Sequence, residues 1–342
     1  MDHVANTRNQ PCHVDPDDLG SARITPTGPF PVATLGTWTL TYTAGRLGLD
    51  DSGAIILVRR IDDGSPPQVA DSTAPGYVTV TTDADVRLEV RCDGGFWVRP
   101  WRGAVIATVR DGSLRQGDTI TLTLGDTRSG SPGWRLQSFP EPQHRFGVLA
   151  DAFGTGEFYW LAEQPAIEIV PGPPAGIEVV LPSLAEAGRP VQGHVRVCDA
   201  FGNPVRGPAG HATIACDGFD PSSCGLPVEI DQGDGVVPFG PITFGEPGDY
   251  RLCVRCGNLA GESNPVRVAA AGRRPFSLYW ADMHGQTAET VGTGTVEEFY
   301  RFARDRALID VASWQGNDFQ VTDDLWREVR RQTPPPTSPA AL

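Results

Sequence analysis

The heptapeptide Thr37-Trp-Thr-Leu-Thr-Tyr-Thr43 alternates hydroxyl-bearing residues with large apolar residues. Successive side chains of a β-strand point to opposite faces, so this alternation predicts a strand with one face in a core and the other in solvent. Trp38, Leu40 and Tyr42 are the expected core residues. The stretch therefore favours a sheet that is buried on one face, as in a β-sandwich.

The sequence contains five further strand candidates before residue 125. They cover residues 53–60, 77–81, 86–91, 105–109 and 119–124. Turn signals such as Asp111-Gly112 and Gly117-Asp118 separate them at intervals typical of a sandwich. Forty glycines and 31 prolines also favour short strands and turns over a helical bundle. We therefore expect a mainly β fold of two β-sandwich domains followed by the first strand-helix units of an α/β barrel.

The predicted domain boundaries follow proline-rich stretches, of which Pro171-Gly-Pro-Pro-Ala-Gly176 is the clearest linker. We expect an extended lead-in (1–30), an N-terminal β-sandwich (31–170), a second β-sandwich (171–269), a partial α/β segment (270–331) and a proline-rich tail (332–342). The turn Asp199-Ala-Phe-Gly-Asn-Pro-Val205 resembles a turn of bacterial immunoglobulin-like domains, which implies that fold for residues 171–269 without implying an activity.

Composition limits the possible partners and the compartment. The net charge is -14, and all 28 basic residues are arginine, so the sequence offers no concentrated basic face for nucleic acid or an anionic membrane. No stretch has the pattern of a signal peptide or a membrane span, which predicts a soluble, cytoplasmic protein. The seven cysteines are an odd number and are expected to be reduced. The oligomeric state is not predicted.

Two smaller patterns are candidate binding sites. Trp97, Trp101, Trp134 and Trp160 suggest carbohydrate binding, although tryptophans in a sandwich are more often core residues or loop plugs. Cys216, Cys224, Cys253 and Cys256 suggest a zinc knuckle, but Cys253 and Cys256 would point to opposite faces of a strand, which favours buried thiols. His144 has no second ligand at metal spacing, so we expect it to be structural.

The segment with most chemical potential is Phe276-Ser-Leu-Tyr-Trp-Ala-Asp-Met-His-Gly-Gln-Thr287, an apolar strand that ends in polar residues. The i, i+2, i+4 spacing of Asp282, His284 and Gln286 places all three on one side of an extended chain, where they could bind one metal ion. Thr295-Val-Glu-Glu298 matches a capping box and predicts a helix. A strand at 308–313 and a second helix from Thr322 complete a parallel α/β pattern.

These motifs resemble the start of the PHP superfamily (polymerase and histidinol phosphatase), within a bacterial branch catalogued as a domain of unknown function. The resemblance matches Asp282 and His284 to the first motif, Asp-x-His-x-His, with Gln286 in place of its second histidine. Asn317 stands where the second-strand histidine is expected, and Asp318 lies beside it. The resemblance implies a distorted barrel that binds divalent metals (manganese, magnesium or zinc) and hydrolyses a small-molecule ester, usually a phosphate ester.

The expected function has two versions. Because the stretch after Val329 becomes proline-rich, we expect the chain to hold only the N-terminal part of such a metal-dependent hydrolase, C-terminally truncated and inactive by itself, with no catalytic residue assigned. The alternative is a non-catalytic β-sandwich module that binds a glycan or a protein, or acts as a scaffold. Bound divalent metal would favour the first version, and recognition of a glycan would favour the second.

Overall fold

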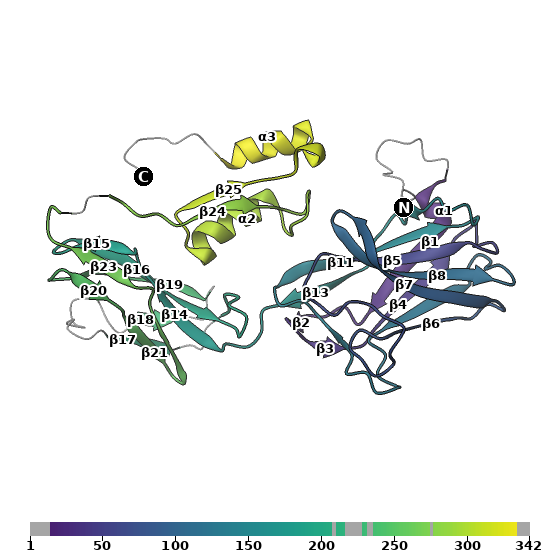
Figure 1. The fold of residues 1–342 in the computed structure, drawn as a ribbon, viewed down its shortest axis with the longest axis horizontal. Coiled ribbons are helices and arrows are strands. Elements are labelled where there is room, and N and C mark those ends of the chain that lie inside the picture. Colours follow the sequence, from purple (N-terminus) through teal and green to yellow (C-terminus); the bar gives the residue numbers. More distant parts are fainter. Residues whose placement is uncertain (1–13, 207–209, 216–227, 231–234, 274–275, 334–342) are drawn as a thin grey trace. The chain divides into compact units, whose positions relative to one another are not determined.

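A computed structural model describes residues 14–206, 210–215, 228–230, 235–273 and 276–333 (Figure 1). The chain divides into two compact units, Met1–Val170 and Pro171–Leu342, which we describe separately. Strands dominate both units, so the prediction of a mainly β fold is confirmed. The first 13 residues of the predicted lead-in and residues 334–342 of the predicted tail lie outside the described residues.

The first unit contains two mostly antiparallel sheets, with strand orders β1-β4-β9-β6 and β2-β13-β11-β5-β8-β7, and β12 pairs with β11. The first sheet consists of β1 (Gly20–Thr25), β4 (Trp38–Ala44), β6 (Val78–Thr82) and β9 (Thr119–Leu124). The second consists of β2 (Phe30–Pro31), β5 (Ala54–Arg60), β7 (Arg87–Val98), β8 (Trp101–Arg110), β11 (Glu141–Asp151), β12 (Tyr159–Trp160) and β13 (Ala166–Val170). Helix α1 (Pro16–Leu19) precedes β1, and β3 (Leu35–Gly36) pairs with β10 (Trp134–Arg135).

Strand β4 forms as its alternating sequence predicts. Trp38, Leu40 and Tyr42 are at most 2% exposed, while the threonines between them are partly exposed. Burying one such side chain contributes about 1.5–3 kcal/mol, so this strand supplies a large part of the core between the two sheets. The Tyr42 hydroxyl donates a hydrogen bond of 2.6 Å to the carbonyl oxygen of Leu19, and burial raises the pKa of Tyr42.

Strand β5 differs from β4 because it is buried on both faces. Its first five residues are all buried, in contrast to the alternation of β4. Ile55 and Leu57 belong to the main core between the sheets, whereas Ile56 and Val58 belong to a second apolar cluster. Since neighbouring side chains of a strand point to opposite faces, the second cluster lies on the outer face of the larger sheet.

The second unit contains a smaller sandwich built from three sheets, with strand orders β14-β16-β19, β15-β23-β20 and β18-β17-β21-β22. The strands are β14 (Gly176–Val180), β15 (Leu184–Glu186), β16 (Pro190–Cys198), β17 (Gly210–Ala215), β18 (Val228–Ile230), β19 (Val236–Thr243), β20 (Gly248–Tyr250), β21 (Cys253–Cys256), β22 (Leu259–Glu262) and β23 (Val266–Ala269). Val195, Ile214, Phe244 and Val254 are at most 1% exposed and belong to one core. The assignment of residues 171–269 to an immunoglobulin-like domain stays a prediction.

The C-terminal part of this unit has the predicted order of strand, helix, strand and helix. The elements are β24 (Ala281–Gly285), α2 (Val296–Phe302) with a π-helical extension (Ala303–Ala307), β25 (Val311–Trp314), a 3₁₀ turn (Asp318–Gln320) and α3 (Asp323–Gln332). The predicted capping box at Thr295 is confirmed, because its hydroxyl accepts from the Glu298 amide while the Glu298 carboxylate accepts from the Thr295 amide. Leu325 and Val329 of α3 pack in a small core with Trp314.

The predicted start of an α/β barrel stays a prediction, because the described residues contain no closed barrel. Within the described residues this region contains a two-stranded parallel sheet of β24 and β25 (Figure 1), and four of the five residues of β24 are exposed. Strands of a parallel barrel are covered on both faces, whereas Trp280 and Met283 are 62% and 57% exposed here. None of the helices in the described part of the chain is both long and apolar enough to cross a membrane.

Candidate functional site

The residues predicted to bind metal lie near the same edge of the two-stranded sheet. Because β24 and β25 are parallel and pair Gly285 with Trp314, the segments that follow them leave the sheet at the same end. Asp282 and His284 are both exposed on β24, and the Asp282 carboxylate accepts a hydrogen bond of 2.9 Å from the backbone amide of His284. Gln286 is half-buried, and its side-chain oxygen is buried without a hydrogen-bond partner.

The second predicted group turns toward its own segment. The Asn317 side-chain amide donates to the Gln320 side chain at 2.9 Å, and the Asp318 carboxylate accepts from the backbone amide of Phe319 at 2.8 Å. In the described parts of the chain, no three His, Cys, Asp or Glu side chains are grouped as metal ligands. The metal site and the choice of manganese, magnesium or zinc therefore stay predictions.

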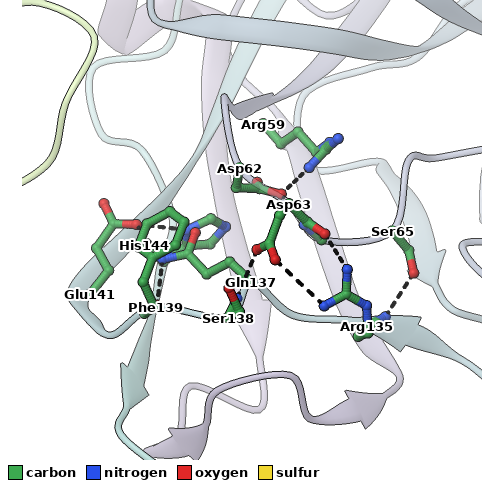
Figure 2. A network of polar contacts seen from close by, with 11 residues as sticks. Arg59, Asp62, Asp63, Ser65, Arg135, Gln137, Ser138, Phe139, Glu141 and His144 are labelled. Carbon is green, nitrogen blue, oxygen red and sulfur yellow. Dashed lines mark hydrogen bonds and ion pairs between the residues drawn. The ribbon is translucent and has the colours of Figure 1, made fainter. Parts of the chain in front are cut away.

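His144 is a structural residue in the first unit, as predicted. It is 4% exposed, its Nδ1 atom lies 2.9 Å from the Glu141 carboxylate, and its ring packs edge-on against Phe146. The Gln137 side-chain amide donates to the same Glu141 oxygen at 3.2 Å and to the carbonyl oxygen of Phe139 at 2.9 Å. Figure 2 shows these contacts, which hold the start of β11 at one end of the sandwich.

The same polar network fixes two adjacent loops. Arg59 forms an ion pair with Asp62, and both side chains are largely buried. Asp63 accepts a hydrogen bond of 2.8 Å from the backbone amide of Ser138 (Figure 2). Burial alone would raise the pKa of Asp63, but the hydrogen bonds from Ser138 outweigh it and lower that pKa. The network therefore joins the loop after β5 to the segment before β11.

Only two of the four cysteines of the predicted zinc knuckle belong to the described residues. Cys216 and Cys224 lie outside the described residues, as does Cys12. Cys253 is exposed and Cys256 is buried, which places them on opposite faces of β21. These two thiols therefore do not bind one metal ion from a regular strand.

Two of the four tryptophans that suggest carbohydrate binding lie close together. The ring centroids of Trp101 and Trp160 are 5.5 Å apart with an interplanar angle of 38°. Trp134 is only 5% exposed and belongs to the main core. Trp97 is 51% exposed, and the Arg102 guanidinium lies 5.8 Å from the centre of its ring.

Trp101 and Trp160 are part of a larger aromatic surface. We call this surface the aromatic face and define it as Phe96, Trp101, Phe158 and Trp160, which are all partly exposed. These four side chains cover the second apolar cluster, whose members are Ile56, Val58, Ala104, Ile106 and Leu149. The aromatic face thus forms the outer surface of the larger sheet, opposite the main core.

A β-bulge decides which rings reach the aromatic face. Val58 pairs with Ala104 and Arg59 pairs with Arg102, so Gly103 is an extra residue in β8, and its φ of 70° suits glycine. The extra residue reverses the alternation of side chains beyond it. Trp101 therefore lies on the outer face, while Arg102 and its partner Trp97 lie on the other side of the β7–β8 hairpin.

Gly147 of β11 makes room for the two tryptophan rings. A β-carbon at this position would lie 2.7 Å from Trp160 Cζ3, 3.3 Å from Trp101 Cε3 and 2.6 Å from Val58 Cγ2. Contacts under 3.0 Å require the neighbouring atoms to move. The absence of a side chain at Gly147 therefore lets both rings lie close to the sheet.

We expect the Gly147→Ala variant to displace the rings of Trp101 and Trp160 and to destabilise the first unit by about 1–3 kcal/mol, as overpacking generally does. The measurement is urea unfolding together with the near-ultraviolet circular dichroism of the tryptophans. Gly156→Ala is the control for replacing a glycine by alanine without a steric clash, since no atom lies within 4 Å of its added β-carbon. The positive φ of Gly156 adds some local strain to this variant. An unchanged tryptophan spectrum for Gly147→Ala would contradict the described packing.

Sequence reasoning missed Phe96, Phe158 and Gly147. The signal that could have found this surface is the unbroken apolar run Ala54-Ile-Ile-Leu-Val58, because a strand with apolar residues on both faces needs a cover on each. The covering rings come from distant parts of the sequence, and only the pairing of β12 with β11 brings Trp160 beside Leu149.

The chain matches no protein-family model and no curated protein sequence. Among solved structures it is similar to the Escherichia coli adhesin FdeC, with 16% identity, coverage of 75% of this chain and 64% of that chain, and a TM-score of 0.32. It is similar to the Yersinia pseudotuberculosis adhesin InvE, with 12% identity, coverage of 73% and 58%, and a TM-score of 0.22. It is also similar to murine CEACAM1b, with 9% identity, coverage of 73% of this chain and 100% of that chain, and a TM-score of 0.20.

The chain spans less than two thirds of the length of either adhesin, and we take no function from scores this low. The predicted membership of the PHP superfamily is wrong, because no protein-family model matches and the similar solved structures include adhesins and an immunoglobulin module. The physical reason is that polar residues after a strand and a capped helix after them are general features of parallel α/β units. Such a local pattern does not require that superfamily.

Proposed function

We propose that the chain is a non-catalytic β-sandwich binding module that holds a glycan on the aromatic face of its first unit. The observation that carries this proposal is the pair of partly exposed rings of Trp101 and Trp160, which lie 5.5 Å apart on the outer face of a sheet. The face is built on a rigid scaffold, because the side chains beneath it are at most 5% exposed.

A glycan suits this surface for chemical reasons. One side of a pyranose ring carries several C–H groups and is apolar, so it can stack on an indole ring, while its hydroxyl groups remain available for hydrogen bonds at the edge. The 38° angle between Trp101 and Trp160 makes the surface bent instead of flat. A single soluble glycan chain can follow such a surface.

A protein partner is the second reading of the same surface, since aromatic residues are also enriched in protein interfaces. Partly exposed tryptophans are common anchors for both kinds of ligand. The aromatic face, however, consists of four rings over one small cluster, which is a smaller patch than a stable protein interface normally buries. We therefore favour the glycan.

The test is a glycan array probed with the full chain, followed by calorimetric titration of the glycans that bind. We expect the Trp101→Ala variant to bind such a glycan roughly 30-fold more weakly, which corresponds to about 2 kcal/mol. Urea unfolding of each variant shows whether it is folded. Trp101→Tyr should restore part of the affinity, because a smaller aromatic ring can still stack.

Phe201→Ala is the control, because Phe201 is an aromatic residue of the second unit that is 52% exposed and lies outside the aromatic face. This control should leave the affinity unchanged. Equal losses in both variants would place the glycan elsewhere, and silence across the whole array would contradict the proposed function.

A further inference from the structure

The aromatic face has arginine side chains at its rim. Arg91 of β7 pairs with Ile106, which belongs to the apolar cluster under the rings, so Arg91 lies on the same side of the sheet. Arg60 of β5 pairs with Trp101 across the strands. Arg145 is exposed and lies two residues before Gly147, which places it beside the tryptophan pair.

The other charged residues on these strands are largely paired with each other. Arg87 forms an ion pair with Asp111, and Arg110 forms one with Glu89. Asp93 of β7 forms no such ion pair in the described residues, and its carboxylate accepts a hydrogen bond from the backbone amide of Gly95. Arg91 and Arg145 therefore place positive charge at this rim, in a chain whose net charge is -14.

Arg91 and Arg145 have no carboxylate partner among the described residues. Arg145 donates a hydrogen bond of 2.9 Å to the side-chain oxygen of Gln143, and no ion pair joins it to Glu168, which also faces this side of the sheet on β13. Both guanidinium groups are thus available to a ligand. At physiological ionic strength charges are screened over about 8 Å, so these local arginines count for more than the distant negative charges.

We propose that the glycan held on the aromatic face is acidic, with its pyranose rings stacked on Trp101 and Trp160 and its carboxylates paired with Arg91 and Arg145. This inference rests on the glycan-binding function proposed above. A guanidinium presents its N–H groups in a planar fork that matches a carboxylate, and such charge-assisted pairs are stronger than neutral hydrogen bonds. A few arginines around an aromatic patch suit the spaced carboxylates of uronate or sialate glycans better than the dense charges of a nucleic acid.

The test uses pairs of glycans that differ only in one charged group. Suitable probes are oligogalacturonate with its methyl ester, oligoglucuronate with its methyl ester, and sialyllactose with lactose. We expect the full chain to bind the acidic member of at least one pair roughly tenfold more tightly, as one charge-assisted hydrogen bond would give. This preference should shrink between 50 and 500 mM salt.

The Arg91→Gln and Arg145→Gln variants should each lose most of this preference while keeping the affinity for the neutral member of the pair. Arg23→Gln is the control, because Arg23 is exposed on β1 of the other sheet. If the neutral members bound equally or more tightly, the proposal that the glycan is acidic would be overturned, whereas the proposed glycan-binding function would remain. If Arg23→Gln also lost the preference, the assignment of the carboxylate contacts to this rim would be overturned. If the full chain bound none of the probes and none of the glycans on the array, both proposals would be overturned.

Discussion

We expect the Asp199→Ala variant to lose about 3–5 kcal/mol of the free energy of unfolding of the second unit, because several donors lose the charged acceptor that they share and each buried donor left without a partner costs about 1–3 kcal/mol. Asp199 is 5% exposed and follows the core strand β16. One of its carboxylate oxygens accepts from the backbone amides of Phe201 and Asn203 at 2.8 and 3.0 Å. The other accepts from the backbone amide of Gly172 at 2.8 Å and from the Asn203 side chain at 2.9 Å.

The same carboxylate should make the second unit sensitive to acid. Burial alone would raise the pKa of Asp199, but the hydrogen bonds from the Asn203 side chain and from the amides of Gly172, Phe201 and Asn203 outweigh it and lower that pKa below 3.8. A carboxyl group with a depressed pKa in the folded state stabilises that state above the pKa of the unfolded chain. This contribution is therefore complete at neutral pH and is lost as the pH falls below about 4.

Hydrogen exchange measured by mass spectrometry separates the two units, because peptides from β14 and β16 report only on the second. In Asp199→Ala, the exchange protection of these peptides should be lower than in the wild type at pH 7. Acidification should then reduce their protection by less than it does in the wild type. Glu246→Ala removes an exposed acidic residue of the same unit and should change neither. Wild-type protection in Asp199→Ala would show that the turn does not stabilise the unit.

The second large effect is expected at Glu141 in the network of Figure 2. Replacing Glu141 by alanine removes the acceptor that His144 and the Gln137 side chain share, and both of these residues are almost fully buried. A buried polar group without a partner costs about 1–3 kcal/mol, so two such groups should destabilise the first unit by about 3–5 kcal/mol. Urea unfolding followed by exchange protection of β11 peptides measures this loss.

Glu141→Gln should be milder, because its amide oxygen can still accept one hydrogen bond in nearly the same shape. Glu163→Ala is the control, since Glu163 is an exposed acidic residue of the same unit. If Glu141→Ala were as stable as Glu163→Ala, the contacts around His144 would not hold the start of β11.

Local patterns predicted the parts of the fold that depend on local physics. The alternation around Leu40 gave β4, and the run 119–124 matches β9 because the same period continues without interruption. The helix after Thr295 was predictable because a capping box satisfies the first amides of a helix with residues only three positions apart. In each case the decisive contacts lie within a few residues of each other.

The aromatic face could not be predicted in this way. Its rings come from β7, β8 and the segment of β12, and their common side depends on strand pairing between distant residues. The extra residues Gly94 and Gly95 in β7 and Gly103 in β8 shift the register, so unbroken alternation along each strand would assign Trp97 to the outer side and Trp101 to the inner side, the reverse of the observed arrangement. The predicted site at Asp282 and His284 rested on local spacing, and the two side chains are exposed at the end of a short sheet.

The bulge at Gly103 also bears on how this surface can change during evolution. If Gly103 paired in register instead of bulging, regular alternation would continue through β8, and Arg102 would take the place of Trp101 on the outer side of the sheet. One change of pairing would thus exchange an aromatic surface for a cationic one without replacing Trp101 or Arg102. A substitution of this residue, whose φ of 70° favours glycine, would then alter ligand preference in a larger step than other point substitutions do, while the core beneath stays the same.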